Sequence, residues 1–105
     1  MEVRCTSIED VRAHIDDIDR QIVALVARRG NYVAQAATFK KTSTDVRAPA
    51  RVEQVITKVR NLAHESGACP DVVESVYRSM IGAFIEQELK EHARLQANAA
   101  ASPVP

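Results

Sequence analysis

The 105-residue sequence has no run of about 18 or more apolar residues, which excludes a helix that crosses a membrane. It has no excess of either charge, because 14 Lys and Arg residues balance 14 Asp and Glu residues. A formal net charge of zero provides no general attraction to nucleic acid or to an anionic membrane surface, so cations must be judged locally. The first ten residues lack the apolar segment of a signal peptide, and we therefore expect a cytoplasmic protein.

Cysteine is scarce, and the sequence contains neither a CxxC motif nor a Cys/His spacing typical of a metal site. Cys5 and Cys69 are far apart, so we interpret them as two free thiols rather than as a disulfide. The sequence also has no Ser-His-Asp set, no Gly-rich loop and no internal repeat. We expect neither a bound metal nor a cofactor, and we assign the three histidines to the surface: His14, His64 and His92.

Two apolar series, each with a spacing of seven residues, predict one very long helix at the start of the chain. Its start is marked by a Thr6-x-x-Glu9 capping box, and polar residues 42–45 break the pattern after about residue 41. At about 1.5 Å per residue, a helix of about 35 residues spans about 50 Å. One series is Ile8, Ile15, Ile22, Arg29 and Ala36, and the other is Val11, Ile18, Leu25, Tyr32 and Phe39.

Two shorter helices complete a three-helix, all-α chain, because no segment alternates with the period of a strand. The second is expected from Pro49 to Ser66, before Gly67, and the third is expected to begin at Pro70. The chain lacks an apolar face from about residue 96, so we expect a helical domain over residues 1–95 and a disordered tail over residues 96–105. The side chains expected to be buried are Val52, Val55, Ile56, Val59 and Leu62 in the second helix, and Val73, Val76, Tyr77, Met80, Ile81, Phe84, Ile85 and Leu89 in the third.

The length of the first helix predicts how chains assemble. A compact domain of this size has a diameter of roughly 33 Å. Two shorter helices of the same chain cannot cover a helix of about 50 Å that is apolar along its whole length. A second copy is the simplest cover, and we therefore predict an intertwined homodimer.

Arg29 interrupts one of the apolar series with a permanent positive charge. Such a charge is costly on an apolar face unless an anion meets it, so we predict a buried anion site. Along one continuous helix, Lys40 lies about 20° around and about 16 Å beyond Arg29, and the two cations can grip one small ligand. Arg12 lies about 100° around and about 25 Å away, and it would reach the partner's pocket in an antiparallel dimer. Taken alone, Arg12 and Lys40 would be ordinary surface cations.

These cations and their neighbours resemble the all-α chorismate mutases over roughly residues 5–92. The resemblance implies an intertwined dimer in which Arg29 and Lys40 bind the substrate's carboxylates and Lys40 also meets its ether oxygen. It implies that Arg51 adds a cation and that Arg12 comes from the other subunit. The matching motifs are Val11-Arg12-x-x-Ile15-Asp16-x-Ile18-Asp19-x-x-Ile22, Arg28-Arg29, Phe39-Lys40, Val46-Arg47 and Arg51.

The chemistry of that family suits these residue types. Rearrangement of the dicarboxylate chorismate to prephenate needs no nucleophile and no cofactor. The enzyme holds the reactive shape of the substrate and stabilises negative charge on the breaking ether oxygen. Arginine grips carboxylates with two hydrogen bonds, and lysine supplies a compact point charge.

Two departures from the family pattern leave the substrate open. Typical mutases carry acidic residues at the positions of Ala48 and Val52, and the apolar residues here are similar to those of the isochorismate pyruvate lyases. Many members of both branches have, at the position of Glu88, a glutamine that donates a hydrogen bond to the ether oxygen. A neutral Glu88 can donate the same bond, which is the role we favour from the sequence, whereas a charged Glu88 would pair with Lys40.

The sequence therefore predicts a chorismate mutase of aromatic amino acid biosynthesis in the shikimate pathway. The alternative is an isochorismate pyruvate lyase of salicylate biosynthesis. A third possibility is a non-catalytic helical dimer that binds a metabolite, but unused buried cations would be costly. The predicted catalytic residues are Arg29, Lys40 and Glu88, and the predicted substrate-binding residues are Arg12, Arg29, Lys40 and Arg51.

Overall fold

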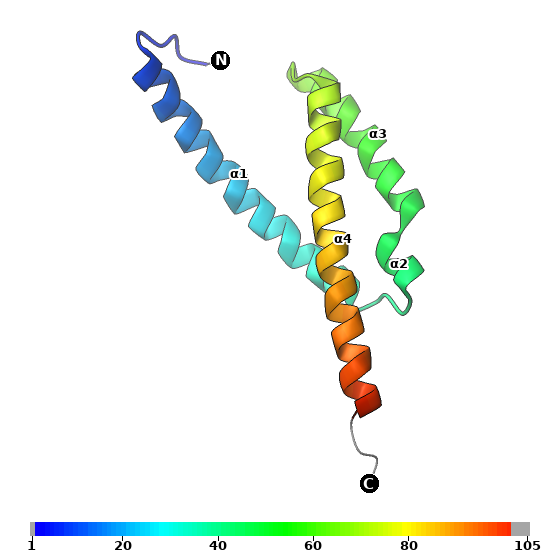
Figure 1. Ribbon diagram of the computed structural model, residues 1–105. Helices are drawn as coiled ribbons and strands as arrows, with labels where there is room; N and C mark the ends of the chain where they lie inside the picture. The colour runs from blue at the N-terminus through cyan, green and yellow to red at the C-terminus, as the bar shows by residue number, and fades with distance from the viewer. Residues whose placement is uncertain (1, 102–105) are drawn as a thin grey trace. The chain divides into compact units, whose positions relative to one another are not determined.

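A computed structural model describes residues 2–101, with side chains as far as residue 98. Helices account for most of the described residues, and none of them forms a strand, so the predicted all-α fold is confirmed. The chain divides into two compact units, Met1–Gln35 and Ala36–Pro105. The helices, shown in Figure 1, are α1 (Ile8–Ala37), α2 (Ser43–Arg47), α3 (Pro49–Ser66) and α4 (Pro70–Ala101).

The start of α1 is capped one residue later than the sequence motif predicts. The Ser7 hydroxyl accepts a hydrogen bond from the Asp10 backbone N–H at 3.0 Å, and the Asp10 carboxylate accepts one from the Thr6 N–H at 3.3 Å. The predicted pairing of Thr6 with Glu9 was therefore wrong. Ser7 and Asp10 are separated by three positions, as are Thr6 and Glu9, and their side chains cap a helix equally well. The sequence is therefore compatible with two overlapping capping boxes.

Helix α1 ends at Ala37, earlier than the predicted end at about residue 41. The backbone N–H groups of Phe39 and Lys40 donate to the carbonyls three residues before them, at Ala36 and Ala37, at 3.1 Å each. This is the tighter hydrogen bonding of a final turn rather than of an α-helix. Lys40 therefore lies beyond α1, and the rotation and rise that related it to Arg29 along one continuous helix were wrong.

A short helix, α2, occupies the polar segment that the sequence analysis interpreted as a break. Thr42 and Asp45 form a reciprocal capping box, with hydrogen bonds of 3.1 and 3.2 Å. Hydrogen bonds from the Lys41 N–H and from Thr42 hold the pKa of Asp45 below its ordinary value. Helices α2 and α3 meet at Ala48, whose φ of 38° lies in the left-handed region, where a Cβ costs about 1–2 kcal/mol.

The core of the second unit is small. Helix α4 packs against both α2 and α3, and α3 lies alongside α4 in Figure 1. Of the residues predicted to be buried, Leu62 is 48% exposed and Val76 is 57% exposed, so these two predictions were wrong. Val52 in α3 is half-buried. Apart from Val76, the apolar residues of α4 that were predicted to be buried are half-buried as well. The buried side chains among the described residues, each 3–7% exposed, are Val46, Val55, Ile56, Val59 and Ala63.

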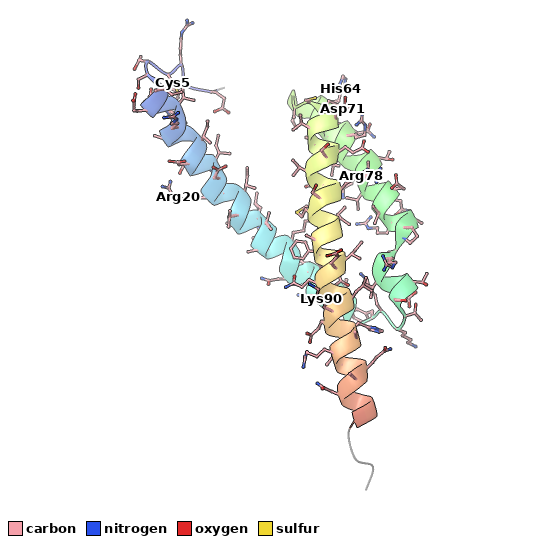
Figure 2. All side chains as sticks on the ribbon, viewed as in Figure 1. Cys5, Arg20, His64, Asp71, Arg78 and Lys90 are labelled. Atoms are coloured by element: carbon pink, nitrogen blue, oxygen red, sulfur yellow. The ribbon has the colours of Figure 1, made fainter. Side chains whose placement is uncertain are left out.

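Charged side chains join α3 to α4. Arg78, labelled in Figure 2, donates two hydrogen bonds of 2.9 Å to the Glu53 carboxylate and one of 2.7 Å to Glu74. Arg60 donates to Glu74 at 2.8 Å and to Asp71 at 3.0 Å. The hydrogen bonds from Arg78 lower the pKa values of Glu53 and Glu74. This pairing therefore contributes to stability at neutral pH, and its contribution is lost as the pH falls through the lowered values.

Helix α1 has no buried residue. Its two apolar series are exposed along the helix, with exposed fractions between 36% and 69%. The first unit by itself buries none of the apolar surface that led us to predict a homodimer, and the homodimer remains a prediction. The exposed members of the two series on α1 are Ile8, Val11, Ile15, Ile18, Ile22, Leu25 and Tyr32.

Helix α4 continues to Ala101, beyond the predicted domain boundary after residue 95. Residues 96–101 are mostly alanine, the residue with the highest helix propensity, so the helix can extend there without an apolar face to bury. The predicted disorder of residues 102–105 lies outside the described residues. In the described part of the chain, no helix has the combination of length and apolarity that crossing a membrane requires.

Candidate functional site

Two of the three predicted catalytic residues contact each other directly. The Lys40 Nζ atom donates a hydrogen bond to the Glu88 Oε2 atom at 3.2 Å, and the two side chains are 23% and 12% exposed. Both residues belong to the second unit, although 48 positions separate them in the sequence. Charged groups that are mostly removed from water need a partner, and here each supplies the other.

Local structure brings Lys40 to this position. The tight turn that follows α1 ends at Lys40, whose N–H donates to the Ala37 carbonyl. The capping box of α2 begins two residues later, at Thr42. Glu88 lies on the half-buried face of α4, one turn after Phe84 and two turns after Ile81. This carboxylate therefore interrupts the apolar stripe of α4.

The remaining predicted cations lie on two helices, α1 and α3. Arg29 is half-buried on α1, and Arg12 is exposed on the same helix. Arg51 is exposed in the first turn of α3 and takes no part in the Lys40–Glu88 contact. Arg29 and Lys40 belong to different units, so their convergence on one ligand remains a prediction.

Ala48 links α2 to α3, and Val52 extends this apolar link into the first turn of α3. The Val52 backbone N–H donates to the Ala48 carbonyl at 3.0 Å, which starts the first turn of α3, and both side chains are half-buried. Neither side chain carries a polar atom. This link therefore offers a substrate no carboxylate to accept a hydrogen bond from a ring hydroxyl.

The structure brings together a further group of reactive side chains, which the sequence analysis missed. Cys5, Asp10 and His14 each place a possible metal-ligating atom within 4.8 Å of the other two. Partial burial and then the neighbouring Asp10 carboxylate raise the pKa of the Cys5 thiol. The four-residue spacing of Asp10 and His14 was the available signal. Both cysteines are free thiols in the structure, and Figure 2 shows Cys5 at the N-terminal end of α1.

Comparison with known proteins gives two matches. The model of the family described as chorismate mutase type II matches residues 11–89. The chain is also 34% identical over 86 residues to a Pseudomonas aeruginosa protein named isochorismate pyruvate lyase, and this alignment covers 82% of the present chain and 85% of that protein. The range matched by the family contains all five predicted site residues, which are Arg12, Arg29, Lys40, Arg51 and Glu88.

Proposed function

Because the chain belongs to the chorismate mutase type II family, we propose that it is an isochorismate pyruvate lyase that converts isochorismate to salicylate and pyruvate. The observation that carries this choice is the apolar link at Ala48 and Val52, where typical mutases are acidic. The similarity to the Pseudomonas aeruginosa protein named isochorismate pyruvate lyase supports the same choice. Chorismate mutase, the first choice from the sequence, is the second candidate here, and it is kept because some mutases carry a glutamate at the position of Glu88.

In this proposal the cations hold a dicarboxylate and Lys40 meets the ether oxygen. The C–O bond breaks while a hydrogen moves from the ring to the departing pyruvate. Negative charge builds on the ether oxygen, and a nearby ammonium group stabilises it. An ammonium has three N–H donors, so Lys40 can keep its bond to Glu88 and still donate to the substrate.

This geometry supports the charged role for Glu88 rather than the neutral, donating role that we favoured from the sequence. The Lys40 Nζ atom lies 3.2 Å from the Glu88 Oε2 atom, within hydrogen-bond distance, so Glu88 accepts a bond from Lys40 here. Glu88 would then act as a positioning residue. It would aim the Lys40 ammonium at the ether oxygen without touching that oxygen itself.

The proposed function is tested by supplying the purified protein with isochorismate and with chorismate in separate reactions. We expect isochorismate to yield salicylate and pyruvate in equal amounts, with a higher kcat/KM than any conversion of chorismate to prephenate. Faster conversion of chorismate would instead establish the mutase activity. If the protein consumes neither substrate, both proposed activities are wrong. The non-catalytic helical dimer that binds a metabolite would then be the remaining hypothesis.

Replacing Glu88 with glutamine distinguishes its two roles. If a charged Glu88 positions Lys40, Glu88→Gln should lower kcat/KM about 10-fold, because the amide makes a weaker bond to the ammonium. The measurement is kcat and KM, determined separately for both proteins on the better substrate.

A suitable control for this test is Glu86→Gln, which changes an exposed carboxylate on the same helix. This variant should keep the wild-type kcat and KM. If Glu88→Gln instead raises kcat/KM, a neutral hydrogen-bond donor at this position serves the reaction better and the positioning role is wrong.

A further inference from the structure

We propose that Cys5, Asp10 and His14 form a binding site for a divalent transition metal of the Zn²⁺ class, at the N-terminal end of α1. Their three possible ligand atoms all lie within 4.8 Å of one another. All three residues belong to the first unit, whereas the Lys40–Glu88 contact belongs to the second. The proposed metal site thus uses none of the residues of that contact and does not depend on the proposed function.

The distances suit tetrahedral coordination. A histidine nitrogen and a carboxylate oxygen that each lie about 2.0–2.2 Å from Zn²⁺ are roughly 3.4 Å apart in a tetrahedral site. The observed distance between the His14 Nε2 atom and the Asp10 Oδ1 atom is 3.5 Å. These two ligands therefore already have almost the separation that the metal requires.

The backbone holds the three ligands in place. Asp10 and His14 are one helical turn apart on the same face of α1. The other carboxylate oxygen of Asp10, Oδ2, accepts a hydrogen bond from the Thr6 N–H at 3.3 Å, and such outer bonds orient ligating carboxylates in metal sites. The same bond fixes the residue that follows Cys5, so the helix cap also positions the thiol.

The types of ligand select the class of metal. A thiolate and a carboxylate together neutralise a divalent cation, and neutral imidazole completes the set without adding charge. Sulfur and imidazole favour Zn²⁺ and similar ions over Mg²⁺ and Ca²⁺, which prefer oxygen ligands. Three protein ligands leave a fourth position for water or another small ligand. The positive end of the α1 dipole opposes the cation, so we expect weaker binding than at a site with four cysteines.

The test uses the full-length protein with Co²⁺ and Zn²⁺ as probes. Co²⁺ should bind one equivalent per chain and produce the visible bands of tetrahedral coordination together with a thiolate-to-metal absorption band. Zn²⁺ should displace it, and the Zn²⁺ affinity is then measured by calorimetry. We expect Cys5→Ser and His14→Gln each to weaken Zn²⁺ binding by at least about 10-fold, because each removes one of three ligands.

Matched controls lie elsewhere in the same chain. Cys69→Ser and His64→Gln change an exposed cysteine and an exposed histidine outside the site and should leave Zn²⁺ affinity unchanged. Zn²⁺ should also slow the alkylation of Cys5 but not of Cys69. Absence of the thiolate-to-metal band, or its loss in Cys69→Ser rather than in Cys5→Ser, would overturn the proposal. Asp10→Asn is less informative because Asp10 also caps α1.

Discussion

Lys40→Ala and Arg29→Ala should each lower kcat/KM by at least about 100-fold, the loss typical of removing one group that stabilises an oxyanion. Lys40 is the cation that we propose for the ether oxygen, and Arg29 is the cation that we propose for a carboxylate. The measurement is kcat/KM on isochorismate and on chorismate. Neighbouring cations provide matched controls, because Arg28→Ala and Lys41→Ala remove the same types of charge from exposed positions.

Loss of Lys40 has a second effect that must be separated from the first. It leaves the Glu88 carboxylate, only 12% exposed, without its partner, and an unpaired buried charge destabilises a fold. The double variant Lys40→Ala with Glu88→Gln removes this effect and should remain as inactive as the single variant. Near wild-type turnover in the double variant, or in Arg29→Ala, would contradict the assigned site.

Mixing two inactive variants should restore activity if the active site is shared between subunits. In a heterodimer of Arg12→Ala and Arg29→Ala chains, one site would combine the intact Arg29 of one chain with the intact Arg12 of the other. The second site would lack both arginines. Random exchange makes half of the dimers mixed, so the mixture should recover about a quarter of wild-type activity.

The result separates a shared site from one built within a single chain. If Arg12 serves the site of its own chain, every site in the mixture lacks one arginine, and mixing restores nothing. Sedimentation of the wild-type protein at low micromolar concentration should give about twice the chain mass, because the exposed apolar series of α1 need a cover. A stable folded monomer at that concentration would contradict the intertwined dimer.

Periodicity predicted the long helices because it reports which residues face a common side. It could not predict where α1 ends, because Phe39 continues the seven-residue series although its backbone forms a tight turn and its side chain is 84% exposed. The short helix α2 was missed for a related reason. Thr42 and Asp45 are polar residues that interrupt an apolar pattern, but at this spacing they also cap a helix.

Glu88 shows how far the sequence predicted the candidate site. Its departure from the glutamine of many family members marked it as unusual, and the pairing with Lys40 was one of two roles considered. The contact itself depends on the path of the chain after α1, and that path includes a turn that periodicity does not encode. Cys5, Asp10 and His14 were missed because the cap brings Cys5 next to residues of the first helical turns.

The charged contacts between α3 and α4 have a consequence for how this sequence can change during evolution. Apolar side chains of similar volume pack almost interchangeably, so the small core by itself tolerates many substitutions. The two-pronged contact of Arg78 with Glu53 requires one alignment of the helices, because a planar guanidinium must face a carboxylate. The charges therefore select one pairing of α3 with α4 against shifted ones. Core residues can be replaced by other apolar residues. Replacement of Arg78 by an acidic residue, in contrast, would require basic residues in place of Glu53 and Glu74.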